Sequence, residues 1–102
     1  MTNAQHLNSI LADITEITGE TTTREQAVEK GHERYLYIEY AAPYGGYRIV
    51  NVGVNNGAHY GAFGGNGCEA RLKYKEMVIK LEGILAGLNC LQTIINKSTQ
   101  TV

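Results

Sequence analysis

The chain has 102 residues, of which 43% are hydrophobic and 19% charged, and its formal net charge is −1 at pH 7. This composition is typical of a globular domain and argues against a wholly disordered chain. A chain of this length forms one domain, residues 1–102, with a small core that oligomerisation would stabilise. The near-neutral charge argues against nucleic acid as a partner, because phosphate binding usually requires an excess of Lys and Arg.

The charges are unevenly distributed along the chain. Residues 1–33 carry six acids and two bases, a net charge of −4, whereas residues 34–102 carry seven bases and four acids, a net charge of +3. An anionic partner is therefore expected to meet the second part of the chain.

Two segments near the N-terminus have the pattern of helices. Apolar residues recur at helical spacing over residues 4–18 and stop at Gly19, which predicts an amphipathic helix. A second, shorter helix is predicted over residues 23–30, with Thr22 and Glu25 as a capping box and Gly31 at its end.

The middle of the chain predicts three strands. Residues 34–41 alternate between apolar and polar positions, and residues 47–54 and 59–63 are short runs of strand formers. Tyr44-Gly45-Gly46 is expected to form the first turn, and Asn55-Asn56-Gly57 carries the Asn-Gly pair typical of a hairpin. Together these segments predict a three-stranded antiparallel meander.

One long apolar-periodic run, from Cys68 to Asn96, predicts a C-terminal helix with Asn66 as its candidate N-cap. The predicted fold class is therefore α+β: the meander, an N-terminal helical segment, and one long C-terminal helix packed on the sheet. The helix is longer than a small sheet can cover. Its remaining length is expected to pack on the N-terminal helix, on a second subunit, or on both.

The cysteines, the N-terminus and the apolar runs bear on localisation. Cys68 and Cys90 fall too far apart along one helix to form a disulfide with each other, which favours a reducing compartment. The N-terminus has no secretory-signal pattern, and no apolar run is expected to approach the roughly 18 residues needed to span a bilayer. We expect a cytoplasmic protein with no membrane partner.

Residues suited to catalysis or metal binding are not grouped in the sequence. His59 has no second histidine or carboxylate at metal or triad spacing, and neither cysteine belongs to a zinc-binding pattern. The expectation is a protein that is not an enzyme and has no metal or cofactor.

The stretch from Tyr44 to Gly67 contains eight of the twelve glycines, together with tyrosines and a neighbouring basic segment. Tyrosine rings can stack on bases, arginine can hold phosphate, and glycine-rich backbone before a helix can bind anions. The alternatives are a tight turn, a solvated basic face and ordinary core packing. The predicted ligand-binding residues are Tyr44, Tyr47, Arg48, Tyr60, Gly64, Gly65, Asn66 and Arg71.

Gly83 and Gly87 form a small-residue patch on the long helix, next to Leu88 and Leu91. Glycine destabilises a helix interior, so two of them indicate a close backbone approach. The approach is either a helix crossing within the chain or a symmetric contact between two chains. These four residues are the predicted interface of a homo-oligomer.

The segments Tyr44-Gly45-Gly46-Tyr47-Arg48-Ile49-Val50 and Arg71 to Leu88 give residues 44–88 a pattern that resembles small uncharacterised proteins of phages and mobile elements. The resemblance implies an accessory protein that antagonises host defence by binding. Two functions are expected from it and the site residues. One is sequestration of a small anionic, nucleotide-like signal; the other is inhibition of a host defence protein, such as a CRISPR nuclease, through the tyrosine-rich sheet surface.

Overall fold

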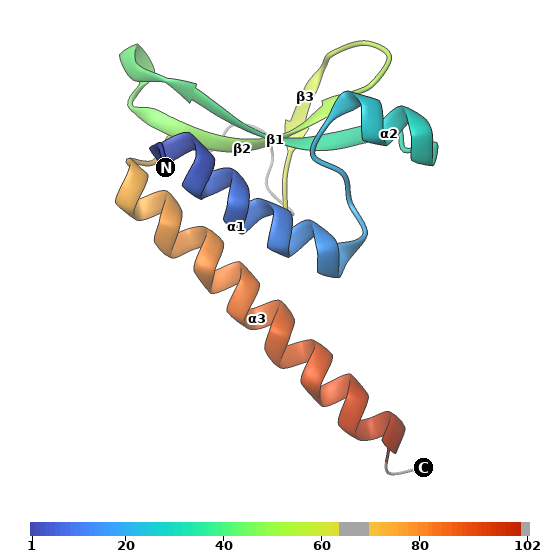
Figure 1. Cartoon of the computed structure of the whole chain (residues 1–102). Helices are drawn as coiled ribbons and strands as arrows, with labels where there is room; N and C mark the ends of the chain where they lie inside the picture. The colour runs from blue at the N-terminus through green and yellow to red at the C-terminus, as the bar shows by residue number, and fades with distance from the viewer. Residues whose placement is uncertain (64–69, 101–102) are drawn as a thin grey trace.

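The computed structural model describes residues 1–63 and 70–100 and confirms the α+β fold class. A three-stranded antiparallel sheet has the strand order β1-β2-β3, with an N-terminal helix and a long C-terminal helix (Figure 1). The helices are α1 (Asn3–Thr18), α2 (Arg24–Lys30) and α3 (Tyr74–Gln100). The strands are β1 (Arg34–Ala41), β2 (Gly46–Gly53) and β3 (His59–Gly61), and the short 3-10 turn η1 (Ala42–Tyr44) joins β1 to β2.

Helix α1 supplies much of the core. Its apolar positions lie on one face, and four of them are buried: Leu7, Ile10, Leu11 and Ile14. The side chain of Thr2 caps the first turn, with Gln5 completing a capping box, and Gly19 ends the helix with a φ of 80°. The predicted helix is confirmed, with its start one residue earlier.

The cap of α2 differs from the predicted one. Thr23, rather than Thr22, is the N-cap, and its side chain accepts a hydrogen bond from the backbone N–H of Gln26. Both the threonine and its partner three residues later are therefore shifted by one position, because three consecutive threonines offer alternative caps. Gly31 ends the helix as predicted.

The sheet follows the alternation predicted from the sequence. Leu36 and Ile38 of β1 and Ile49 of β2 are buried in the main core with α1, so this is the inner face of the sheet. Glu39 of β1 is paired with Arg48 of β2, and both belong to the opposite, outer face. The predicted strand 34–41 is confirmed, whereas β2 begins and ends one residue earlier than predicted and β3 ends at Gly61.

The long helix begins later than the sequence indicates. Residues 70–73 are not helical, and Leu72 forms an isolated antiparallel bridge with Tyr47, so α3 starts at Tyr74. The bridge uses the backbone of Leu72 for the sheet and therefore delays the helix. The predicted cap, Asn66, lies outside the described residues. At the observed start, the side chain of Glu76 accepts a hydrogen bond from the backbone N–H of Lys73.

Helix α3 packs mainly along α1, and its first turns also contact β2. Met77 and Leu81 are buried there, whereas the C-terminal half continues past the end of α1, away from the sheet (Figure 1). By length and composition alone, the segment Tyr74–Lys97 is apolar enough to cross a membrane. Core helices of soluble proteins pass the same test when they are mostly buried, whereas only 6% of this window is buried. Length and composition alone therefore do not decide whether the helix meets a membrane.

Candidate functional site: an aromatic pocket between two helix N-termini

A depression of about 360 Å³ lies where the β1–β2 hairpin meets the starts of α1 and α3. Its volume is near the lower end of the range of small-molecule sites, roughly 300–1,000 Å³. We call it the aromatic pocket, because three of its eight lining residues are tyrosines: Asn3, Tyr40, Ala42, Gly45, Gly46, Tyr47, Lys73 and Tyr74.

The sheet register brings the first two rings together. Tyr40 and Tyr47 are direct partners across β1 and β2, so their side chains lie on the same face. Their ring centroids are 4.6 Å apart and the ring planes are inclined by 34°. This spacing is that of an interacting aromatic pair. Tyr40 remains largely exposed, which leaves ring surface available to a planar ligand.

Backbone hydrogen bonds between Tyr47 and Leu72 position the side of the pocket that Lys73 and Tyr74 form. The N–H of Tyr47 donates to the carbonyl of Leu72, and the N–H of Leu72 donates to the carbonyl of Tyr47. A side chain at Gly46 would collide with the Leu72 carbonyl, so glycine is needed for this approach. The pairing fixes Lys73 and Tyr74, the next two residues, at the pocket.

A contact between the two helices holds Tyr74. Its hydroxyl is hydrogen-bonded to Nδ1 of His6, which lies in the second turn of α1, and the two ring centroids are 5.8 Å apart. The rotation of the Tyr74 ring is therefore restricted before any ligand binds.

The pocket has a positive electrostatic character. Asn3 and Tyr74 are the first residues of α1 and α3, and Figure 1 shows the two helices starting beside one another. Helix N-termini carry a partial positive charge, and Lys73 adds a full one. None of the eight lining residues is a carboxylate. Glu76 reduces this potential in part, since it lies in the first turn of α3.

The predicted phosphate-binding arginines lie on the other face of the sheet. Arg48 follows Tyr47 directly in β2, and neighbouring strand residues face opposite sides. Glu39 accepts bonds from Arg71 and pairs with Arg48 at 3.3 Å and with His59 at 3.3 Å. The Arg71 hydrogen bond holds the pKa of Glu39 below its ordinary value. Burial opposes this pKa shift, and the charges of Arg48, Arg71 and His59 reinforce it.

Arg71 therefore acts as a structural clamp. Besides its bond to the Glu39 carboxylate, its Nη1 donates to the backbone carbonyls of Glu39 at 3.2 Å and Gly46 at 3.1 Å. Its side chain is only 11% exposed. A guanidinium used in this way has little capacity left for a ligand phosphate.

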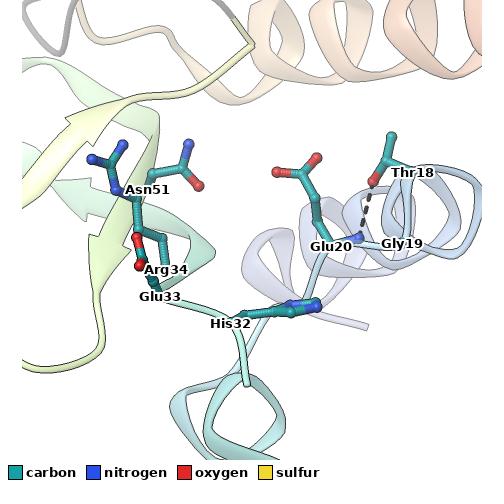
Figure 2. Close-up of a pocket in the computed structure, with 7 residues that line it drawn as sticks. All are labelled: Thr18, Gly19, Glu20, His32, Glu33, Arg34 and Asn51. Atoms are coloured by element: carbon teal, nitrogen blue, oxygen red, sulfur yellow. Dashed lines mark hydrogen bonds between the residues drawn. The ribbon is translucent and has the colours of Figure 1, made fainter. Parts of the chain in front are cut away.

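Tyr60 lies at the opposite end of the inner face, under Arg34, whose guanidinium carbon is 3.6 Å from the ring centroid. This is the geometry of a cation–π contact. Arg34 also lines a larger depression, of about 440 Å³, with Thr18, Gly19, Glu20, His32, Glu33 and Asn51. Figure 2 shows Glu20 on the far side of this depression from Arg34 and Asn51. Because Glu20 and Glu33 bring two negative charges against the one positive charge of Arg34, this depression is less suited to an anion than the aromatic pocket.

The predicted ligand residues thus do not converge on one site. Tyr47 lines the aromatic pocket, and Tyr44 is 77% exposed in the adjoining η1 turn. Arg48 and Arg71 meet at Glu39, and Tyr60 is stacked with Arg34. Gly64, Gly65 and Asn66 lie outside the described residues.

Seven of the eight lining residues do not belong to the predicted site: Asn3, Tyr40, Ala42, Gly45, Gly46, Lys73 and Tyr74. Tyr40 could have been found, because the antiparallel hairpin pairs it with Tyr47. Lys73 and Tyr74 could not, because their position depends on the Leu72 bridge.

The four residues of the predicted oligomer interface, Gly83, Gly87, Leu88 and Leu91, differ in their surroundings. Among residues 1–63 and 70–100, a Cβ added at Gly83 or Gly87 would meet nothing within 4 Å, so these glycines serve no helix crossing in that part of the chain. Leu88 is half-buried against the core cluster, whereas Leu91 is exposed. The contact between two chains that these glycines suggested stays a prediction.

No protein-family model matches the chain, and neither a curated protein nor a solved structure matches it. Among the described residues, no group of three or more His, Cys, Asp or Glu side chains is arranged to hold a metal ion.

Proposed function

We propose that the protein binds a small aromatic anion of the nucleotide type in the aromatic pocket, without transforming it. The single observation that carries this proposal is the convergence of stacked tyrosine rings with Lys73 and two helix N-termini at one depression. Aromatic rings can hold a base, while a lysine and helix N-termini attract phosphate.

The biological role that fits such binding is sequestration. A phage-type accessory protein would lower the concentration of a nucleotide-like defence signal in the host cell by holding it. This role requires affinity and a sufficient amount of protein, and it requires no catalytic group.

Native mass spectrometry tests the proposal with the protein purified from host cells whose defences are active. We expect a nucleotide-sized mass that stays bound under native conditions and is released unaltered on denaturation. A protein that carries no small molecule, and that binds none of a panel of mononucleotides and cyclic oligonucleotides in calorimetry, would contradict it.

Paired variants then locate the site. Tyr40→Ala and Lys73→Ala remove a stacking ring and a cation from the pocket, and each is expected to weaken binding. Stacking on one aromatic residue is worth roughly 1–3 kcal/mol, so the Tyr40 variant should lose about fivefold or more in affinity. Tyr37→Ala and Lys75→Ala are the matched controls, because both residues are exposed and neither lines the pocket. Equal losses in the control variants would place binding elsewhere.

A second function is supported by the exposure of the tyrosines at this end of the sheet. Tyr40 is 58% and Tyr44 77% exposed, and tyrosine is enriched in protein interfaces. A protein that covers a host effector, such as a CRISPR nuclease, could use them without a pocket. Capture of the effector by ligand-free protein, lost in Tyr44→Ala and retained in Tyr37→Ala, would favour this function over sequestration.

A further inference from the structure

Helix α3 carries a second apolar face, turned away from α1. At 100° per residue, six positions between 79 and 94 lie within about 50° of one direction, on the side of the helix away from Met77 and Leu81. We call them the far face of α3: Ile79, Gly83, Ala86, Gly87, Cys90 and Ile94. Ile79 is 72% and Ile94 55% exposed, and the small residues between them are exposed as well.

The composition of this helix is unusual for one that is exposed to water. Residues 83–96 include no charged side chain. A helix that is apolar or uncharged on all sides is normally covered by something. Glycine at positions 83 and 87 destabilises the helix relative to alanine, and a close backbone approach is the usual compensation. Nothing within the described chain makes that approach.

We propose that a second copy of this chain covers the far face, with the two α3 helices packed antiparallel about a two-fold axis between Ala86 and Gly87. The pattern of residues about this point is self-complementary. Ile79 of one copy faces Ile94 of the other, and Gly83 faces Cys90. Large side chains thus meet at both ends, and small residues allow the helices to approach closely at the centre.

The charges at the ends of the face favour the same arrangement. The antiparallel pairing brings Glu76 of one copy to the level of Lys97 of the other, and the two-fold axis repeats this contact. A parallel pair would instead put Glu76 beside Glu76 and Lys80 beside Lys80, which is repulsive.

A membrane is a poorer occupant of this face. The segment that is long and apolar enough to cross a membrane, Tyr74–Lys97, carries four charged side chains in its first nine residues: Lys75, Glu76, Lys80 and Glu82. Charged side chains are costly inside a bilayer. On the opposite side of the same helix, Met77 and Leu81 are buried in the core of the protein, so the first turns of the helix are not free to enter a bilayer.

Cysteine cross-linking of the full chain tests the pairing. In a Cys68→Ser background, Gly83→Cys is expected to form a covalent dimer under mild oxidation, linked between positions 83 and 90 of different copies. The introduced side chain has free space in the monomer. The same background without the added cysteine should remain uncrosslinked, and so should the control Glu82→Cys, whose thiol is turned about 100° around the helix. A link between two Cys90 residues would overturn the antiparallel arrangement.

Sedimentation velocity supplies the second readout. The wild-type chain is expected at twice the chain mass, and Ala86→Glu, which places two carboxylates at the axis, should weaken dimerisation about tenfold or more. Asn89→Glu, an exposed change off the far face, should leave it unchanged. A wild-type protein that stays monomeric at about 100 µM would overturn the proposal, and so would a monomer that cosediments with lipid vesicles.

Discussion

The backbones of Tyr47 and Leu72 exchange two hydrogen bonds, with nitrogen–oxygen distances of 2.8 and 2.7 Å. This exchange holds the chain against β2 just before α3 begins. Two consequences follow for the site: the helix starts at Tyr74, and Lys73 is brought beside the tyrosine pair of the β1–β2 hairpin.

The first prediction concerns Gly46, which lies at the closest point of this contact with a φ of 127°. Gly46→Ala adds a Cβ that collides with the Leu72 carbonyl. Gly45→Ala is the control, because its φ of 95° is also unfavourable but its Cβ would meet nothing within 4 Å. We expect Gly45→Ala to cost roughly 1–2 kcal/mol of unfolding free energy in urea titrations and Gly46→Ala to cost more. Equal losses would show that the Leu72 contact does not constrain the fold.

The second prediction separates the role of Arg71 from ligand binding. Arg71→Ala removes the donor to a carboxylate and to two backbone carbonyls, which should cost about 1–3 kcal/mol of unfolding free energy. Nucleotide affinity, measured at a temperature where the variant is folded, should change by less than about twofold. A large loss of affinity with little loss of stability would instead restore Arg71 to the ligand site.

Local patterns predicted most of the secondary structure. The periodicity of α1, the alternation of β1 and the Asn-Gly turn before β3 each depend on residues close in sequence. The beginning of α3 could not be predicted in the same way, because Leu72 is removed from the helix by its bond to Tyr47, which is distant in the chain.

The predicted ligand residues lie on two faces of the sheet, and the sequence pattern alone indicates this separation. Tyr47 and Arg48 are consecutive in a strand, so they face opposite sides of the sheet. The clamp that Arg71 forms on Glu39 was not predictable, since it depends on three separate segments of the chain lying side by side.

The third prediction tests the cap of α2. Thr23→Ala should cost about 0.5–2 kcal/mol of unfolding free energy, because the backbone N–H of Gln26 loses its side-chain acceptor. Thr22→Ala is the matched control and should cost less, since the Thr22 side chain does not cap the helix. The two variants are compared by urea denaturation at one pH. A larger loss in Thr22→Ala would return the cap to the position that the sequence pattern first indicated.

The fourth prediction is a pH dependence of stability that originates at Glu39. Its pKa is lower in the folded chain than the ordinary value of 4.5, chiefly because Arg71 donates a hydrogen bond to the carboxylate. The ionised carboxylate therefore stabilises the fold above pH 4.5, and this contribution is lost as the pH falls through the lower, folded-state pKa.

Glu39→Gln removes the titrating charge and leaves Arg48 and Arg71 without their carboxylate. We expect the variant to be less stable than the wild type at pH 7, with the difference in unfolding free energy shrinking below pH 4.5 as the wild-type carboxyl is protonated. Urea denaturation curves measured from pH 7 to about pH 3 give this difference from their midpoints and m-values. Glu29→Gln, an exposed change on α2, supplies the control for a general effect of charge. Because Glu39 has two arginine partners, a difference that stays constant across the range would mean that the carboxylate is not held by them.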